Sequence, residues 1–383
     1  MKINKKIIKK KSQMIVGSQM TILFSLIAGA FIIIFFVTLT TSVRSNADKE
    51  LNQNLIIKMK EMLKNARDHI NSLDIAIMPT EIQFKNHCEG FYLENIPKIS
   101  NDYIFAPDAI KGRLFYFYST QVLMPFYVND ISLISTEKIN NIFVIKNGEA
   151  SIFINELMNS DEEISFPNFH NTIIDVGDLL DNNKMKKIIS RNDIETRFIY
   201  FGDDPSVNNS IKNLIVNINS KRYIGDFYLI HVNDDYDLTS TDSKSKINDV
   251  NEIEYYRFNK NKNLFITQDK VFTYGKTFLH AAINVDSKLS YDCQIELLQK
   301  DYQRLSKLYI SKTEEIIRNL DVANTGSAIN SYTSINNSLN ILLNVFNGSI
   351  DFNKANYIKS NINSIKTYQN LLRSSSKNLP LIY

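Results

Sequence analysis

The sequence predicts an α+β protein held in a membrane by one N-terminal helix, and three observations carry that prediction. A long apolar segment without charges lies near the N-terminus, residues 80–286 contain short β-type runs between turn formers, and apolar residues after position 287 recur at helical spacing. We therefore expect a basic cytoplasmic segment at residues 1–12, a transmembrane helix at 13–43, a stalk helix at 44–79, an α/β head at 80–286 and a C-terminal region of antiparallel helices at 287–383.

The membrane segment is defined by a contrast in charge. Six lysines lie within the first eleven residues, whereas residues 12–43 carry no formal charge. About 20 apolar residues in a helix cross a bilayer core of about 30 Å. The positive-inside rule then places the N-terminus in the cytoplasm and the bulk of the chain outside the cell membrane. A cleaved secretory signal is the alternative, because residues 45–47 (SNA) have a small-x-small pattern, but the apolar stretch is longer than a usual signal core.

The charge balance argues against nucleic-acid binding. The net charge is +3, and the six leading lysines alone exceed it, so the remainder of the chain is net negative. A nucleic-acid-binding protein normally has a basic patch in its folded part. The lysines are better placed to contact anionic lipid headgroups, which makes the lipid bilayer the first expected partner.

Small residues form a stripe along the membrane segment. Gly17, Thr21, Ser25 and Gly29 recur every four residues, so they share one face of a helix. Such a face lets two transmembrane helices approach closely, which predicts self-association or contact with a protein partner. The alternative is the ordinary abundance of Gly, Ser and Thr in transmembrane helices.

The first forty residues resemble a known family of precursors. The sequence KKSQ at residues 10–13 precedes the long apolar helix, and GSQ at residues 17–19 offers a second similar position. This arrangement is similar to the start of archaeal type IV pilin-like precursors, in which basic residues, a small residue and Gln mark the peptidase site. The resemblance implies cleavage after about residue 12 or 17 and a pilin-like assembly role, and it does not extend beyond this segment.

Helical spacing continues beyond the membrane segment. Apolar residues alternate spacings of four and three, which predicts a coiled-coil seam or a packed helix that ends at Met78-Pro79: Leu55, Met59, Met62, Ala66, His69, Leu73 and Ala76.

The head is expected to be mixed, with a mostly antiparallel sheet. The strongest feature is a hairpin at residues 141–155, in which Asn147-Gly148 suits a two-residue turn. A helix is expected within residues 176–190. The predicted strands are residues 113–118, 121–128, 142–145, 151–155, 197–201, 214–218, 223–232, 253–258, 264–267 and 277–285.

Three helices are expected after residue 287. The first spans residues 287–321, the second contains Ile335 to Phe346 and ends near Gly348, and the third contains Ile358 to Leu372. We expect the first to return along the stalk helix as its antiparallel partner. Independent packing under the head is the alternative.

Two kinds of residue suggest covalent chemistry. Cys88 and Cys293 are the only cysteines, and outside the cell they could form a disulfide or remain separate buried thiols. Asn208, Asn336 and Asn347 each begin an N-x-S sequon, which an Asn-rich chain also produces by chance.

The histidines and acidic residues give no metal or catalytic pattern. His87-Cys88 lacks a second ligand pair, His69 is expected to be half-buried on the helix seam, and His170, His231 and His280 are interpreted as structural. Residues 233–242 (NDDYDLTSTD) could supply calcium ligands but depart from the EF-hand pattern, so a solvated loop is favoured. The aromatic residues at 115–118 alternate between two faces and are assigned to core packing rather than to a ligand pocket.

No P-loop, G-x-S-x-G or HExxH motif occurs, so we expect no enzyme activity, no cofactor and no metal site. The favoured function is that of a membrane-anchored extracytoplasmic protein with a structural or protein-interaction role at the cell envelope. A ligand-binding or sensing ectodomain that acts through a partner is the first alternative, and an extracytoplasmic hydrolase is the second.

Overall fold

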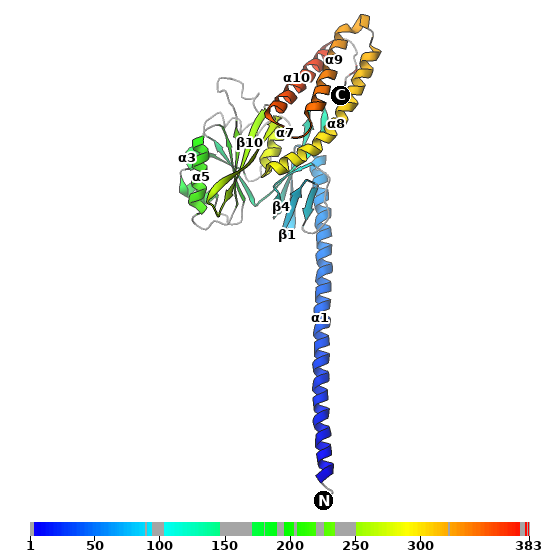
Figure 1. Cartoon of the computed structure of the whole chain (residues 1–383), viewed down its shortest axis with the longest axis vertical. Helices are drawn as coiled ribbons and strands as arrows, with labels where there is room; N and C mark the ends of the chain where they lie inside the picture. Colours follow the sequence, from blue (N-terminus) through cyan, green and yellow to red (C-terminus); the bar gives the residue numbers. More distant parts are fainter. Residues whose placement is uncertain are drawn as a thin grey trace. The chain divides into compact units, whose positions relative to one another are not determined.

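One long helix, two β-sheets and a C-terminal group of helices make up the described part of the chain (Figure 1). The computed structural model describes residues 4–88, 90–93, 103–145, 171–179, 181–189, 195–202, 205–219, 226–233, 250–320, 322–375, 380 and 382. The chain divides into two compact units, Met1–Lys58 and Met59–Tyr383.

Helix α1 (Asn4–Asp68) contains a segment that is long and apolar enough to cross a membrane. Ser25–Val43 has a mean hydropathy of 2.4, and none of it is buried. Thr38 and Thr41 donate their hydroxyl hydrogens to the backbone carbonyls of Ile34 and Val37, at 2.7 and 2.9 Å. These bonds satisfy polar groups that hydrocarbon could not solvate. A signal sequence meets the same criteria of length and composition.

The predicted extension of the helix to Met78 is wrong. α1 ends at Asp68, Asn71 has a φ of 63°, and strand β1 (Leu73–His87) begins two residues later. Ile75 and Ile77 are exposed whereas Ala76 and Met78 are buried, so this stretch follows the period of a strand. The spacing of Leu73 and Ala76 fitted a helix by coincidence. Residue 79, a proline, lies where the pairing of β1 with β4 shifts register, so its missing N–H disturbs no ladder.

Sheet A has five strands in the order β2-β1-β4-β5-β3. The strands are β2 (Gly90–Leu93), β3 (Tyr103–Phe105), β4 (Ala109–Leu123) and β5 (Tyr127–Thr136) together with β1. All pairings are antiparallel except that of β3 with β5. Residues 124–126 connect β4 to β5, so the single strand predicted at 121–128 is divided by a turn.

Sheet B has six strands in the order β11-β10-β9-β8-β6-β7. They are β6 (Ile139–Ile145), β7 (Asn171–Asp175), β8 (Glu195–Phe201), β9 (Phe227–Asn233), β10 (Val250–Asn259) and β11 (Leu264–Tyr274). The neighbouring strands β7, β6, β8 and β9 are parallel to one another. β10 and β11 continue the sheet beyond β9 with antiparallel pairings. Of the nine described pairings in both sheets, five are antiparallel, so the head is more evenly mixed than expected.

The hairpin predicted at residues 141–155 is not formed by β6. This strand pairs with β8 along one edge and with β7 along the other, both in parallel. A strand has only two edges, so no edge of residues 141–144 is left for an antiparallel partner. The Asn147-Gly148 turn and the strand predicted at 151–155 lie outside the described residues.

One face of sheet B is covered by α3 (Val176–Leu179), α4 (Asn182–Ile188) and α5 (Pro205–Asn219). The helix expected within 176–190 is thus two short helices. The strand predicted at 214–218 is wrong, because it belongs to α5. Val207, Ile211 and Leu214 are buried at spacings of four and three, a stripe that a window of five residues could not reveal.

The other face of sheet B shares a core with one face of sheet A and with four helices. These are α7 (Gly275–Asn284), α8 (Lys288–Asn319), α9 (Val322–Val345) and α10 (Phe352–Ser374). The strand predicted at 277–285 is wrong, because that segment is α7. Residues 278–284 are all buried, and a segment buried on every side has no periodicity to separate helix from strand.

The three C-terminal helices are confirmed. Ser287 caps α8 by accepting a hydrogen bond from the N–H of Ser290, and Gly348 follows α9 with a φ of 72°. α8 packs against α9 and against β3, β5 and β11, and α9 packs against α10. This arrangement matches the alternative expectation that the first C-terminal helix packs with the head.

Candidate functional site

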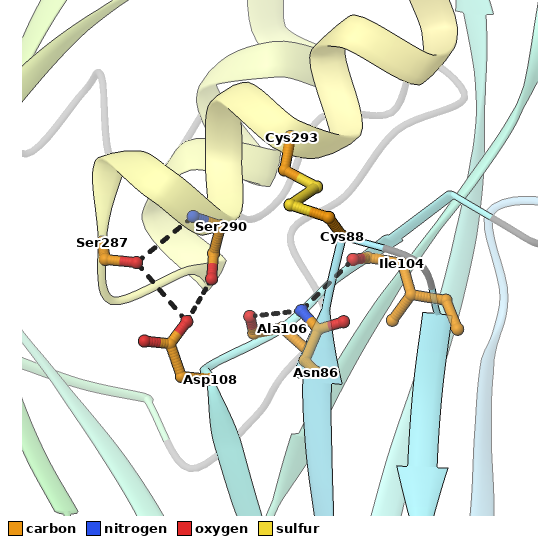
Figure 2. The surroundings of a disulfide bond; sticks show 8 residues. All are labelled: Asn86, Cys88, Ile104, Ala106, Asp108, Ser287, Ser290 and Cys293. Carbon is orange, nitrogen blue, oxygen red and sulfur yellow. Dashed lines mark hydrogen bonds between the residues drawn. A yellow bond between two sulfur atoms is a disulfide. The ribbon is translucent and has the colours of Figure 1, made fainter. Parts of the chain in front are cut away.

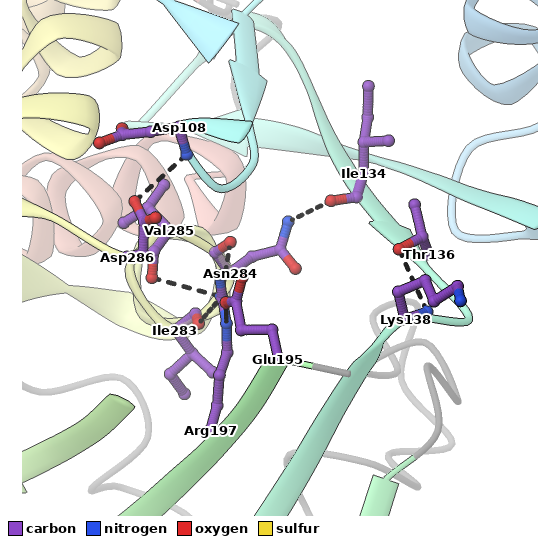
Figure 3. A network of polar contacts seen from close by, with 10 residues as sticks. All are labelled: Asp108, Ile134, Thr136, Lys138, Glu195, Arg197, Ile283, Asn284, Val285 and Asp286. Carbon is purple, nitrogen blue, oxygen red and sulfur yellow. Dashed lines mark hydrogen bonds and ion pairs between the residues drawn. The ribbon is translucent and has the colours of Figure 1, made fainter. Parts of the chain in front are cut away.

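Arg197 is the centre of a buried polar cluster between the two sheets (Figure 3). Its side chain is 1% exposed and forms an ion pair with Glu195 at 2.6 Å. Its Nη1 also donates to the carbonyls of Ile283, Asn284 and Val285 at 3.1–3.4 Å. These carbonyls end α7, where the negative end of the helix dipole favours a cation. Arg197 therefore fastens β8 to the C-terminus of α7.

Asn284 extends this cluster to sheet A. Its side-chain amide donates to the carbonyl of Phe105 at 2.5 Å and to that of Ile134 at 3.2 Å. Phe105 ends β3 and Ile134 lies in β5, and both strands belong to sheet A. The backbone carbonyl of Asn284 accepts from Arg197 on β8 of sheet B, so the last residue of α7 has polar contacts with both sheets (Figure 3). We call Glu195, Arg197, Asn284 and Asp286, together with the exposed Asp108 at their edge, the buried joint.

Asp286 is the titratable member of the buried joint. Burial raises the pKa of its carboxyl group to about 7, although the charge of Arg197 acts in the opposite direction. The backbone N–H of Asp108 donates to its Oδ1 at 3.3 Å. Since Glu195 already pairs with Arg197, a second carboxylate in the same buried place is disfavoured, and Asp286 holds a proton far more readily than an exposed aspartate.

A disulfide lies beside the buried joint and links Cys88 to Cys293 (Figure 2). The two Cα atoms are 5.2 Å apart, and 205 residues separate the cysteines in sequence. Asp108 accepts hydrogen bonds from Ser287, at 3.4 Å, and from Ser290. The end of β1 and the start of β4 are thus both attached to the N-terminus of α8. Because Cys88 is bonded to Cys293, it cannot form a nucleophile or metal site with His87.

A second polar cluster surrounds His231 on β9. Its Nε2 lies 2.6 Å from the carbonyl oxygen of Gly202, and its Nδ1 lies 3.3 Å from Glu254 Oε2. Tyr256 donates to the same carboxylate oxygen at 2.5 Å, and the imidazole stacks on Tyr200. Both ring nitrogens thus lie against oxygen atoms, and one of these oxygens belongs to the Glu254 carboxylate with which His231 pairs.

The electrostatics of Glu254 agree with that pairing. Burial acts to raise the pKa of Glu254, but hydrogen bonds from Tyr256 and His231 outweigh it and lower the pKa below its usual value. Glu254 lies directly across from His231 in the pairing of β9 with β10. Sequence reasoning missed the pair because the register of two strands 23 residues apart was not known; once that register is given, the pair is evident.

The predicted helix-association face lies in α1. Ser25 is exposed, and no atom lies within 4 Å of the place where a Cβ on Gly29 would be. Gly17 and Thr21 are helical, while their side-chain surroundings lie outside the described part. The single chain leaves room for a neighbour at Gly29 without showing one.

The remaining histidines are dispersed. His69 follows α1 and is exposed, so the expected half-buried position on a helix seam is wrong. His280 is fully buried within α7. His170 and the acidic loop at residues 234–242 lie outside the described residues. Within the described ranges, no group of three or more His, Cys, Asp or Glu side chains is placed to hold a metal ion.

The aromatic residues of β4 form core, as predicted. Phe115 and Phe117 are buried on one face of sheet A, where Phe115 packs edge-on against Phe84, and Tyr116 and Tyr118 join the core shared with sheet B. Two adjoining recesses share Phe272, Tyr291 and Ile350 in their linings, and each has a cavity volume of about 10 Å³. Each is far smaller than the 300–1,000 Å³ typical of small-molecule pockets.

The described polar residues therefore mainly attach one element of the domain to another, and Asp286 in addition holds a proton. The buried joint and the disulfide connect β1, β3, β5, β8, α7 and α8, and the His231 cluster links β9 to β10 through His231 and Glu254. No family model, curated protein or solved structure matches the chain, so its function is argued from these residues alone.

Proposed function

We propose that the chain is a single-pass membrane protein with a cytoplasmic N-terminus and an extracytoplasmic domain that has a structural or protein-interaction role at the cell envelope. One observation carries the proposal. Within Ser25–Val43, large apolar side chains are exposed along the whole segment, including Phe31 at 69%, Ile33 at 64% and Val43 at 60%. Such exposure is unfavourable in water and favourable in lipid.

Two further observations support the proposed orientation. The lysines lie on the N-terminal side of the span, as the positive-inside rule requires for a cytoplasmic N-terminus. The Cys88–Cys293 disulfide lies C-terminal to the span along the chain. Disulfides persist in oxidising surroundings and are rare in the cytosol, so the pair favours an extracytoplasmic position for the folded domain.

The interaction role is supported by how the domain is built. Its elements are held together by a disulfide and a buried ionic cluster, and the described recesses are small. Tyr357 and Leu371 are both more than half exposed on α10, two heptads apart and therefore on similar sides of the helix. A rigid domain with exposed aromatic and apolar side chains suits contact with a protein partner.

A pilin-like subunit is the specific form of this proposal. It rests on KKSQ at residues 10–13 and GSQ at residues 17–19 before the apolar helix. It predicts a mature protein that lacks the first 12 or 17 residues. N-terminal sequencing of the protein from its own membranes checks this, and an intact Met1 contradicts the pilin-like form while leaving the membrane anchor in place.

The anchor is tested by extraction of membranes at alkaline pH. The full chain is expected to stay in the membrane pellet, and replacing both Ile33 and Phe35 by Arg is expected to release it, since each Arg near the centre of a span costs roughly 3 kcal/mol. Ile57→Arg is the matched control, because Ile57 is also exposed on α1 but lies outside the apolar span. Wild-type protein in the soluble fraction would contradict the proposal.

A further inference from the structure

The three N-x-S sequons occupy different structural settings. Asn208 lies within α5 and Asn336 within α9, whereas Asn347 follows the end of α9. We propose that Asn347 is an N-glycosylation site and that it is the one sequon of the three that the fold can present to a transferase. The inference rests on the proposed function, because it requires residue 347 to lie outside the cell membrane.

The two helical sequons are poor acceptors. The side-chain amide oxygens of Asn208 and Asn336 are buried, and both residues are only partly exposed. Their backbones are also committed to helix hydrogen bonds, so neither tripeptide can take up the extended or turned shape in which a transferase binds it. A glycan at either place would have to replace packing of α5 or α9 against the domain.

Asn347 lies in an exposed turn between α9 and α10. Asn347, Gly348 and Ser349 are all exposed, and Gly348 has a φ of 72°, which a glycine accepts without strain. The middle residue of the sequon is therefore a glycine that the turn requires. A proline at this position would block the modification, and none is present.

The backbone of this turn is held in place by side chains that leave the sequon uncovered. Lys354 Nζ donates to the carbonyls of Asn347 and Ser349, each at 3.0 Å. Gln299 on α8 donates to the carbonyl of Gly348 at 2.8 Å. These bonds use backbone carbonyls only, and Asn347 and Ser349 are both exposed.

The reaction assigned to Asn347 is a glycosyl transfer from a lipid-linked oligosaccharide. The side-chain nitrogen forms a bond to the anomeric carbon of the first sugar. The bond between that carbon and the phosphate oxygen of the lipid carrier breaks, the lipid phosphate leaves, and the amide nitrogen loses one proton. No oxidant or reductant is needed.

The test is production of the full chain in a eukaryotic secretory host, which supplies both donor and transferase, followed by mass spectrometry of intact glycopeptides. Trypsin leaves Asn336 and Asn347 in one peptide, residues 319–354, so fragment ions must place the glycan. We expect one glycan, on Asn347. Asn347→Gln and Ser349→Ala should abolish it, Ser349→Thr should retain it, and Asn208→Gln and Asn336→Gln should leave it unchanged.

A control sequon separates failure of the site from failure of the orientation. Lys260→Asn combined with Lys262→Thr creates a sequon in the exposed turn between β10 and β11 of the same domain. A glycan there but not on Asn347 overturns the site and leaves the proposed orientation intact. Absence of glycan at both places in membrane-integrated protein overturns the orientation, and the site with it.

Discussion

Among the carboxyl groups that the structure describes, that of Asp286 has a pKa raised far above the usual value. Its pKa is raised from 3.8 to about 7, first by burial and then by Glu195 and Asp108, against the attraction of Arg197. The folded state therefore holds a proton that the unfolded state releases. The resulting stability is fully present below about pH 4 and is lost as the pH rises through about 7.

Replacing Asp286 by Asn tests this directly. The amide keeps the size and polarity of the protonated acid but cannot ionise. We expect the variant to be more stable than wild type at pH 8, by up to about 4 kcal/mol for a shift of about three pKa units, and nearly equal to it at pH 4. Urea unfolding of the full chain in detergent at both pH values measures the difference.

Asp226→Asn is the matched control, because Asp226 is more than half exposed and pairs with Lys260 at the surface. Its effect on the free energy of unfolding should stay within about 1 kcal/mol at both pH values. Equal stability of the Asp286 variant and wild type at pH 8 would show that Asp286 is ionised at no cost in the folded protein.

His231 gives a second prediction at this scale. His231→Phe keeps a ring to stack on Tyr200 but removes both nitrogens, which leaves the Gly202 carbonyl and Glu254 without that donor. Unpaired buried polar groups cost about 1–3 kcal/mol each, so a loss of at least that size is expected at pH 7 in thermal or urea unfolding. The exposed His69→Phe should change stability little, and an equally small effect for His231 would refute a role for its hydrogen bonds.

At the scale of the elements, the disulfide between Cys88, which follows β1, and Cys293 in α8 joins these two elements. The bond closes a loop of 205 residues. In the loop-entropy account such a closure stabilises the folded state by about 5 kcal/mol at most, mainly by restricting the unfolded chain. The adjacent bonds from Ser287 and Ser290 to Asp108 attach the start of β4 to the N-terminus of α8 independently of the disulfide.

Cys88→Ser is therefore expected to fold and to lose stability. A reducing agent should lower the unfolding temperature of wild type and leave that of the variant unchanged, with Cys293→Ser behaving in the same way. Thermal unfolding with and without reductant measures both. If reductant leaves the wild-type unfolding temperature unchanged, the bond does not contribute to stability.

The elements also show what sequence can and cannot predict. The N-terminal apolar helix and the C-terminal helices were predictable because their patterns are long. Short runs were not: residues 214–218 and 277–285 have β-type composition, yet α5 is set by a stripe that begins at Val207, and α7 is buried on every side. The hairpin at 141–155 failed because β6 takes parallel partners distant in sequence.

The candidate sites depended even more on tertiary structure. Cys88 and Cys293 could be named from the sequence as the sole pair of thiols. The role of Arg197 could not be predicted, because Ile283, Asn284 and Val285 bind it through backbone carbonyls. Every residue type has such a carbonyl, so the sequence does not distinguish these partners. Long-range packing, rather than any local pattern, selects the buried arginine.

At the scale of the whole molecule, we propose that one helix crosses the membrane and that the domain with the disulfide lies outside. Unit 1 contributes the exposed apolar helix, and unit 2 contributes the folded domain. The signal-sequence alternative shares the outside location but not the retained helix, so a test must detect both ends of the chain.

The most direct measurement is protease digestion of intact cells that carry the full chain with one epitope at each terminus. We predict that external protease removes the C-terminal epitope while the N-terminal epitope survives on a membrane-bound fragment ending just beyond residue 43, and that both are lost once the cells are opened. A C-terminal epitope protected in intact cells, or a mature chain lacking the apolar helix, would contradict the account.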